Sequence, residues 1–330
     1  MNDLETIIAM LSHRRPAGSA SEMAFITKFI MPLGAKMDKH GNWCLSIGEN
    51  PTVLWSSHTD SVHIKDGYQK VDYDGKYITL PLNSKSNCLG ADCAAGVWIM
   101  TEMIKAKVPG MYIFHFAEEI GCVGSNAIAE KEPGRLADIK AAVAFDRRGN
   151  ADVITHQRVR TASDAFALSF AAQLPARFKP SDKGFLTDTK QYMHLIPECS
   201  NISVGYYNEH QKHESLDVGH LIELRNRMVK IDQSKFVIER IPFSTKPVST
   251  KKLSSLSGGG FGSRRHRKEE TLRDLIYWHP DEVAAFMENN GVTFDELHDQ
   301  IYGRRKSIAD LFNDEEWMKS VLGNDLNKVA

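Results

Sequence analysis

Four apolar runs of this chain each end at or near a residue that can bind a metal ion. The first leads to His58, the second to Glu118, the third to Asp146, and the fourth ends near His210. Short apolar runs rich in β-branched and aromatic residues predict strands. Ligands of open α/β sheets bind outside the carboxyl ends of the strands. The pattern therefore predicts a sheet that brings these side chains together at one end of its strands.

Helical patterns lie between the predicted strands. Helices are expected over residues 3–11 and 21–30, the second with Ser21 as its N-cap, and a further helix follows Asp92. Such an alternation predicts an α/β fold with a mixed, mostly parallel central sheet and helices on both faces. The expected strands, with one hairpin at 68–80, cover residues 43–47, 52–56, 111–116, 141–145 and 202–207.

The composition of the chain changes after residue 242. Residues 243–270 are rich in Ser, Gly and basic residues, which predicts a flexible linker. Residues 271–330 are acidic and show helical patterns, so we expect a small C-terminal helical module there. The main domain is expected over residues 1–242. The helical candidates of the C-terminal module are residues 281–288, 294–302 and 308–322.

The chain is nearly neutral, with 41 Lys and Arg residues against 42 Asp and Glu residues. This balance gives no reason to expect a nucleic-acid or membrane partner, and we interpret the basic residues at 264–268 as part of the solvated linker. The first ten residues lack the pattern of a signal peptide, and no apolar run approaches the roughly 20 residues that span a bilayer. The five cysteines include no C-x-x-C pair, which favours reduced thiols and a cytoplasmic location.

The first candidate motif is W-S-S-H-T-D-S, which contains His58 and Asp60. Residues two apart on a strand point to the same side. Asp60 is therefore placed to accept one imidazole N–H of His58 while the other ring nitrogen binds a metal ion, and metal-binding histidines usually have such a partner. Taken alone, the H-x-D pair is also typical of an ordinary surface pair.

The second motif is L-G-A-D-C-A-A-G, around Asp92. An aspartate at the start of a helix is often only an N-cap. It can also bridge two metal ions, and Gly90 and Gly96 would then let the backbone approach closely.

The third motif is F-H-F-A-E-E-I-G, in which Glu118 and Glu119 directly follow an apolar strand. Buried carboxylates are costly unless they are paired or bind a metal ion. Neighbours at a strand end point to opposite sides, so one glutamate is expected to hold a metal ion while the other reaches a water molecule. Helix capping is the alternative.

The last two motifs are A-A-V-A-F-D-R-R-G, with Asp146, and G-Y-Y-N-E-H-Q-K-H-E, with His210 and His213. Each of these residues alone is more often an ordinary loop residue than a ligand. The whole set, however, supplies imidazole nitrogen and carboxylate oxygen, which are ligands of catalytic zinc. A bridging aspartate with two further ligands per ion predicts a two-metal site, whose ions lie about 3.5–4 Å apart.

In this order, the five motifs resemble those of the co-catalytic two-zinc exopeptidases, which include leucyl aminopeptidases, glutamyl aminopeptidases and tripeptidase T. The resemblance covers about residues 1–240 and implies that Glu118 is the general base and that Asp60 orients His58. It favours His210 over His213 as the last ligand, although an acid follows each histidine by four residues. The implied zinc ligands are His58, Asp92 and Asp146 for one ion, and Asp92, Glu119 and His210 for the other.

The distances between motifs imply a compact form of this family. The chain between Asp146 and His210 is too short for the lid domain of tripeptidase-like members. The chain between His58 and Asp92 is too short for the inserted β-domain of glutamyl aminopeptidases. The resemblance also implies a cis peptide bond between Asp92 and Cys93, where many relatives carry Asp or Asn in place of the cysteine.

The resemblance implies a zinc metallopeptidase, most of all an aminopeptidase-type exopeptidase, which cleaves a peptide bond with water activated by two Zn²⁺ ions. Co²⁺ or Mn²⁺ would accept the same ligands. An acyl-amino-acid amidohydrolase or a carboxypeptidase on the same site is an alternative. An inactive binding module that acts through the helical tail is an alternative of another class.

Residues near the ligands bear on the substrate, which is expected to be a peptide or an acylated amino acid. Asp188, next to Thr187, is suited to hold a substrate α-ammonium group, which would favour an aminopeptidase. Arg147, with Arg148, is suited to hold a carboxylate, which would favour the two alternative activities. Ordinary loop or surface roles are open for all four. The C-terminal module is expected to serve in homo-oligomer formation or in contact with a partner, or to dock on the main domain.

Overall fold

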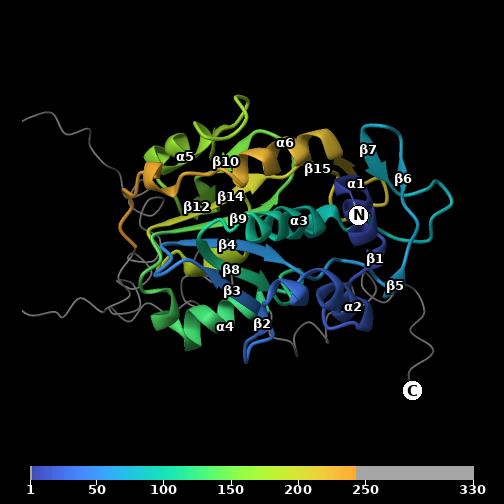
Figure 1. The fold of residues 1–330 in the computed structure, drawn as a ribbon, viewed down its shortest axis with the longest axis horizontal. Helices are drawn as coiled ribbons and strands as arrows, with labels where there is room; N and C mark the ends of the chain where they lie inside the picture. Colours follow the sequence, from blue (N-terminus) through green and yellow to red (C-terminus); the bar gives the residue numbers. More distant parts are fainter. Residues whose placement is uncertain (1, 243–330) are drawn as a thin grey trace, which may run out of the picture. The chain divides into compact units, whose positions relative to one another are not determined.

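An eight-stranded mixed sheet lies at the centre of residues 2–242, the part of the chain that the computed structural model describes (Figure 1). Its strands are β2 (Lys36–Met37), β3 (Trp43–Ile47), β4 (Val53–His58), β8 (Gly110–His115), β9 (Ala141–Arg147), β10 (Asp152–Ile154), β13 (Lys179–Ser181) and β14 (Glu198–Ser203). The spatial order is β13-β10-β14-β9-β4-β8-β3-β2. The central strands β14, β9, β4 and β8 are parallel, whereas β2, β3 and β8 pair antiparallel, as do β10 and β14. The predicted α/β fold with a mostly parallel sheet is thus confirmed.

The central strands contribute side chains to two hydrophobic cores. Trp55 of β4 and Tyr112 of β8 belong to one core, whereas the neighbouring Leu54 and Ile113 belong to the other. Successive side chains of a strand point to opposite faces of the sheet. Because both faces are covered, β8, β9 and the first half of β4 are apolar on both sides, which is why they stand out in the sequence as continuous runs.

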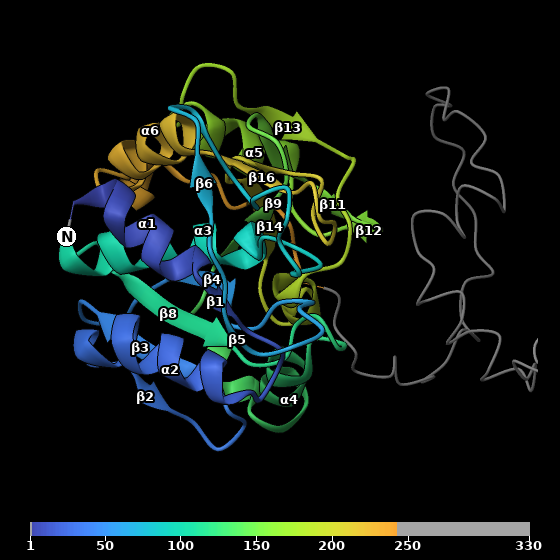
Figure 2. The ribbon, with the colours of Figure 1, turned by 90° about the vertical axis from the view of Figure 1, so that its right-hand side faces the viewer.

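Helices cover both faces of the sheet (Figures 1 and 2). The α-helices are α1 (Asp3–Leu11), α2 (Ala20–Phe29), α3 (Ala91–Lys105), α4 (Val123–Lys131), α5 (Asp164–Ala171) and α6 (Val218–Met228). The 3₁₀ helices are η1 (Met31–Leu33), η2 (Pro133–Leu136), η3 (Asp188–Tyr192) and η4 (Gln233–Lys235). α3 packs on β4 and β9, and α1, α2, α5 and α6 share its core. Ile128 of α4 and Tyr192 of η3 belong to the core of the opposite face.

A smaller antiparallel sheet lies beside the start of α3. It has the order β15-β16-β7-β6, and its β6–β7 hairpin agrees with the hairpin expected at 68–80. This sheet brings the chain around His210 next to a hairpin more than a hundred residues earlier. Its strands and those of the two remaining pairs are β6 (Asp72–Tyr73), β7 (Tyr77–Thr79), β15 (Tyr206–Tyr207), β16 (Ser215–Asp217), β1 (His13–Arg14), β5 (Gly67–Tyr68), β11 (His156–Gln157) and β12 (Val159–Arg160).

The strand expected over residues 202–207 is wrong. β14 ends at Ser203, and Tyr206 already pairs with β16 of the smaller sheet. The chain turns at Gly205, which has a φ of 98°, in the left-handed region that favours glycine. A Cβ at this position would also lie 2.7 Å from Cδ2 of His220. One apolar run thus serves two sheets because a glycine divides it.

The N-cap of α2 also differs from the expectation. Ser19, not Ser21, caps the helix, because its side chain accepts the backbone N–H of Glu22. Ser21 lies inside the helix, where its hydroxyl donates to the carbonyl of Arg14 and accepts the N–H of Gly67. Ser21 therefore joins α2 to the β1–β5 pair instead of starting the helix.

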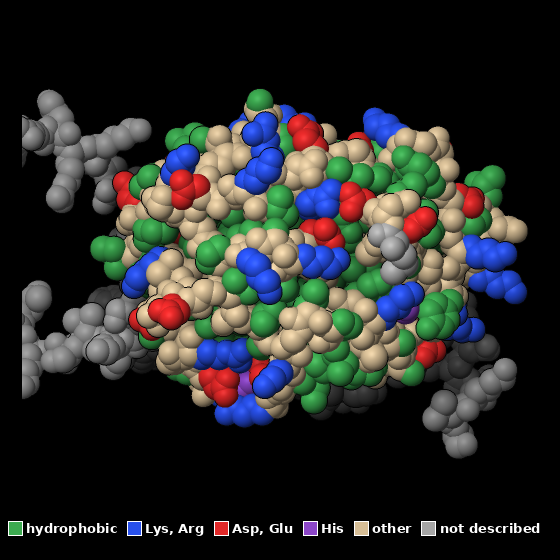
Figure 3. Space-filling model, viewed as in Figure 1, with side chains coloured by type: hydrophobic (Ala, Val, Ile, Leu, Met, Phe, Trp, Pro, Cys, Tyr) green, Lys and Arg blue, Asp and Glu red, His purple; other side chains and the backbone are tan. Residues whose placement is uncertain are grey.

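Several predictions concern residues that are not described. The linker at 243–270 and the three helical candidates of 271–330 lie outside the described residues and stay predictions. Among residues 2–242, no helix has the length and hydropathy that crossing a bilayer requires. No disulfide joins the five cysteines, all of which lie in this part of the chain. On the face seen in Figure 3, basic and acidic side chains are interspersed, in keeping with the balanced composition.

Gly96 is where α3 comes closest to the sheet. A Cβ on Gly96 would lie 2.1 Å from the carbonyl oxygen of Phe145 on β9 and 2.8 Å from Oγ of Ser57 on β4. Overpacking of this kind costs about 1–3 kcal/mol or more. We expect Gly96→Ala to lower the free energy of unfolding by at least that amount in urea denaturation. Gly134→Ala, which meets nothing within 4 Å, is the control and should change it by less than about 1 kcal/mol. A Gly96→Ala variant as stable as the control would contradict this packing.

Candidate metal centre

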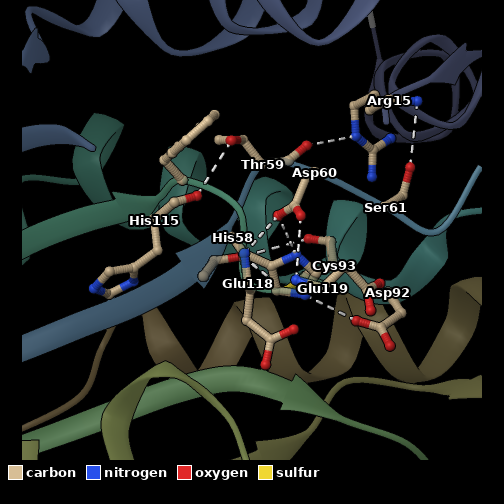
Figure 4. A network of polar contacts seen from close by, with 12 residues as sticks. Arg15, His58, Thr59, Asp60, Ser61, Asp92, Cys93, His115, Glu118 and Glu119 are labelled. Atoms are coloured by element: carbon tan, nitrogen blue, oxygen red, sulfur yellow. Dashed lines mark hydrogen bonds and ion pairs between the residues drawn. The ribbon is translucent and has the colours of Figure 1, made fainter. Parts of the chain in front are cut away.

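His58, the last residue of β4, is the buried centre of the site (Figure 4). Its Nδ1 lies 3.2 Å from Oδ1 of Asp60. Its Nε2 lies 3.0 Å from Oδ1 of Asp92 and 3.5 Å from Oδ1 of Asp146. The imidazole is therefore oriented by one aspartate and directed at two others, as the H-x-D motif predicts.

Asp60 does more than orient His58. Its carboxylate also accepts the backbone N–H groups of Glu118 and Glu119, at 3.1 and 3.2 Å (Figure 4). A fully buried carboxylate is unfavourable unless hydrogen-bond donors of this kind satisfy its oxygens. Asp60 thus links the end of β4 to the turn that follows β8, a role that the sequence pattern did not reveal.

Asp92 lies between the two histidines of the site. One of its oxygens faces His58, and the other lies 3.2 Å from Nε2 of His210. The same His210 nitrogen lies 3.1 Å from Oε2 of Glu119. The peptide bond between Asp92 and Cys93 is cis, as the resemblance implies.

Asp146 lies near the end of β9 and is held by three neighbours. Thr187 donates its hydroxyl to Oδ2 at 2.6 Å, and the hydroxyl of Tyr206 lies 3.4 Å from Oδ1. The side chain of Asn201 bonds to both backbone groups of Asp146, at 2.9 and 2.8 Å. Neither Asn201 nor Tyr206 was predicted as part of the site: Asn201 lies outside all five motifs, and Tyr206 lies in the last one but is apolar enough to be taken for a strand residue.

Burial and the charges of neighbouring groups shift the pKa values of the acids in this site. Burial raises the pKa of Glu118 to about 10 and that of Asp146 to about 8, and it also raises the pKa of Glu119. Burial acts on Asp92 in the same direction, but hydrogen bonds from His210 and His58 hold its pKa below the usual value. The hydrogen bonds to Asp92 and Glu119 raise the pKa of His210 to about 11. So many carboxyl groups in one buried site favour the binding of a cation.

The residues present fit a metal ion. His58, Asp92 and Glu119 offer ligand atoms that all lie within 4.8 Å of one another, and so do His58, Cys93 and Asp146. Oε1 of Glu119 is buried and has no hydrogen-bond partner among the described residues. The Cys93 thiol donates to the carbonyl of Phe145 at 2.9 Å, and burial raises its pKa, so it stays protonated and is not suited to be a ligand. Imidazole nitrogen and carboxylate oxygen remain, a donor set that suits zinc.

A pocket opens directly onto this cluster. It joins the acids to two arginines and to the apolar Phe185 and Leu186. The pocket is lined by Asp92, Glu118, Glu119, Asp146, Arg147, Arg148, Phe185, Leu186, Asn201, Tyr206, Glu209 and His210.

The residues expected near the substrate are distributed differently. Asp188 is buried outside the pocket lining, where it accepts the hydroxyl of Ser125 at 2.6 Å and lies 3.3 Å from Nδ1 of His115. Thr187 contacts Asp146, as described above. Arg147 lines the pocket, and its Nε donates to Asp152 at 3.1 Å.

His213 is exposed and is absent from the pocket lining, whereas His210 lies at its edge beside Asp92 and Glu119. Among the described residues, the geometry thus favours His210 for the last ligand.

Residues 43–193 match the model of peptidase family M28. The matched residues include His58, Asp92, Glu119 and Asp146 but end before His210. No curated protein matches the sequence. The family match supports a metal-dependent peptidase.

Solved structures of peptidases have the same fold. Aminopeptidase PepT from Bacillus cereus is 15% identical, with a TM-score of 0.51, and the match covers 68% of this chain and 96% of that one. A tripeptidase from Staphylococcus aureus is 15% identical, with a TM-score of 0.55 and coverages of 70% and 97%. The Pyrococcus horikoshii TET1 peptidase, which can assemble into a tetrahedron or a large octahedral shell, is 14% identical, with a TM-score of 0.54 and coverages of 68% and 98%.

The cluster of buried acids leads to a prediction on stability. A ligand that binds only the folded state raises stability, by about 4 kcal/mol at a thousand times its Kd. We therefore expect chelation to lower the Tm of the protein by roughly 8–16 °C, and added Zn²⁺ to restore it. Asp92→Ala, which removes the central carboxylate, should abolish the response to Zn²⁺ in the same thermal unfolding assay. A Tm that is insensitive to both chelator and Zn²⁺ would show that the cluster holds no metal ion.

Proposed function

We propose that this chain is an aminopeptidase-type exopeptidase whose site holds two Zn²⁺ ions. The observation that carries the proposal is the position of Asp92, whose two oxygens face the imidazoles of His58 and His210. A carboxylate shared between two ligand groups is what a two-metal site needs. Co²⁺ or Mn²⁺ would accept the same donors.

The proposed ligands fall into two sets that share this aspartate. His58 and Asp146 complete one set, since Nε2 of His58 lies 3.0 Å from Oδ1 of Asp92 and 3.5 Å from Oδ1 of Asp146. Glu119 and His210 complete the other set, since Oε2 of Glu119 lies 3.1 Å from Nε2 of His210. Asp60 and Thr187 support the first set through their hydrogen bonds to His58 and Asp146.

Glu118 is the proposed general base. When bound, the metal ions polarise the scissile carbonyl and lower the pKa of water. Glu118 lines the pocket, and the bond from its N–H to Asp60 fixes its backbone. Its carboxylate takes a proton from the attacking water and passes it to the leaving amine. Burial raises the pKa of Glu118 in the metal-free site, and a neighbouring cation would lower it again, so that the carboxylate can accept a proton near neutral pH.

Glu118→Gln tests this role. General acid–base catalysis contributes about 10²–10⁴-fold, so we expect kcat on an aminoacyl anilide to fall by at least about 10²-fold while the zinc content of the purified protein stays at the wild-type value. Glu119→Gln is the matched control, since it removes a proposed ligand and should lower the zinc content as well. Full turnover by metal-loaded Glu118→Gln protein would assign the base to another group.

The charges around the pocket favour a substrate amino group over a substrate carboxylate. Arg147 is paired with Asp152 and Arg148 with Glu209, so both guanidinium charges are already compensated. Oε2 of Glu209, by contrast, is buried and has no hydrogen-bond partner among the described residues. Arg148 already compensates the charge of Glu209, so Glu118 and Glu119 are the acids that make the pocket suited to an α-ammonium group, whereas Asp188 lies outside the pocket lining. An acyl-amino-acid amidohydrolase or carboxypeptidase is therefore the second candidate.

Substrates of two kinds separate these activities. We expect aminoacyl anilides with a free amino group to be cleaved with a kcat/KM at least about tenfold above that of N-acylated amino acids, because only the former carry the cation that the acidic pocket would bind. Steady-state assays on the zinc-loaded protein measure both. The reverse preference would favour the amidohydrolase or carboxypeptidase. Absence of both activities in protein that binds no metal would favour a binding module that acts through residues 271–330.

The proposal includes a cellular setting and an assembly. A cytoplasmic location is supported by the five free thiols, four of which are buried. We also expect several copies of this chain to assemble, with or without the C-terminal module, because the Pyrococcus horikoshii TET1 peptidase can assemble into a tetrahedron or a large octahedral shell. Its direct measure is the molar mass in solution of the full chain and of a chain that ends at residue 242.

A further inference from the structure

Glu214 is a fully buried acid outside the proposed ligand set. Both of its carboxylate oxygens accept backbone N–H groups from one short segment that immediately precedes and includes Asp92. The donors are Leu89 and Gly90, at 2.8 and 2.9 Å from Oε2, and Ala91 and Asp92, at 2.8 and 3.2 Å from Oε1. A single side chain therefore holds four consecutive N–H groups of the chain that carries the central aspartate.

These N–H groups need a partner from elsewhere. The first N–H groups of a helix have no acceptor within the helix, and Gly90, the N-cap of α3, has a left-handed φ of 74° and no side chain that could supply one. A carboxylate at this end also complements the helix dipole. Glu214 thus caps α3 from a segment more than a hundred residues away in the sequence.

The carbonyl groups of the same segment are held from the other side. The buried Arg15 donates from Nη2 to the carbonyl of Gly90 at 3.0 Å, and from Nε to the carbonyl of Thr59 at 2.9 Å (Figure 4 shows Arg15 beside Thr59). Gln69 donates to the carbonyl of Leu89 at 2.8 Å. Residues 89–92 are therefore fixed relative to the end of β4, and Glu214 is the contact that fixes them relative to the segment after β15.

That segment is the one that carries His210. Glu214 follows His210 by four residues, and its own N–H donates to the carbonyl of Gln211 at 3.0 Å, which closes the chain between the two into a turn. His210 is half exposed and has a left-handed φ of 65°. Its Nε2 nevertheless lies within 3.2 Å of both Asp92 and Glu119. Glu214 is the buried end of this turn, and His210 is its solvent-exposed end.

We propose that Glu214 is a positioning residue that sets the separation of His210 from Asp92, and thereby the affinity of the metal site that these two residues share. The proposal rests on the proposed two-metal function. Partners that orient metal ligands without touching the ion typically change metal affinity by 10–100-fold when they are mutated. The other metal site shares Asp92, but its ligands His58 and Asp146 have their own supports in Asp60 and Thr187 and make no contact with Glu214, so its affinity should change less.

The chain offers a matched control in Glu198 of β14. This glutamate is equally buried and accepts backbone N–H groups from Ser163, Glu239 and Arg240, at 2.6 to 2.8 Å. None of these contacts involves a proposed ligand. Glu198→Gln therefore reproduces the loss of a buried carboxylate that binds backbone N–H groups, without a direct effect on Asp92 or His210.

The test is titration of the metal-free full-length protein with Co²⁺, followed by absorption spectroscopy and calorimetry. In the wild type we expect two bound ions. Glu214→Gln places an NH₂ group against N–H donors. We expect it to lower the affinity for one of the two ions by about 10–100-fold and to leave the affinity for the other ion within about threefold of the wild-type value. Glu214→Asp keeps the charge and should restore part of the loss, which keeps the test valid if Glu214→Gln does not fold. Glu198→Gln should bind both ions as the wild type does, even if its Tm falls.

The outcomes separate the inference from the function on which it rests. Two ions of wild-type affinity in Glu214→Gln would overturn the positioning role and leave the two-metal site intact. An equal loss of metal affinity in Glu198→Gln would also overturn it, because the effect would then be one of general stability. A wild type that binds no metal, or only one ion, would overturn the proposed function and the inference together.

Discussion

The contact on which the site depends is the one between Asp92 and the two imidazoles on either side of it. His58 ends a strand of the central sheet, and His210 lies in the connection between β15 and β16 of the smaller sheet, so Asp92 joins the two sheets at the site. An acid this deeply buried would be unfavourable by itself. The two imidazoles make its charge tolerable, and the same charge makes the pocket attractive to cations.

The sheet explains how residues so far apart in the sequence come together. β8, β4 and β9 are adjacent and parallel, so the turn after β8 and the ends of β4 and β9 meet at one edge of the sheet. β14 continues the parallel order on the far side of β9 and places Asn201 beside Asp146. The crossovers between these strands leave the edge open, and this is the place where an open α/β sheet binds its ligand. α3 then enters from this edge and carries Asp92 at its first turn.

The sequence alone was sufficient for β3, β4, β8 and β9 and for the residues at their ends, because these strands contain apolar runs and a charged residue or histidine at such an end is easily noticed. It was not sufficient where one glycine changes the direction of the chain, as at Gly205, since apolar composition continues across the turn. It was also misleading at α2, where Ser19 and Ser21 are both plausible caps and only the contact of Ser21 with Arg14 distinguishes them. Glu214 was noticed only as an acid after His210. Its partners are backbone N–H groups, which every residue except proline has, so no residue pattern points to them.

The unequal exposure of the two histidines affects how readily the site exchanges bound groups with bulk water. His58 is 1% exposed, whereas the side chain of His210 is 46% exposed. Solvent therefore contacts the cluster at the imidazole of His210, whereas the imidazole of His58 is buried. A group bound at a buried position dissociates slowly, whereas a group bound at an exposed position exchanges rapidly with solvent. The difference in exposure therefore favours faster exchange beside His210 than beside His58, even though both halves of the cluster use the same kinds of donor.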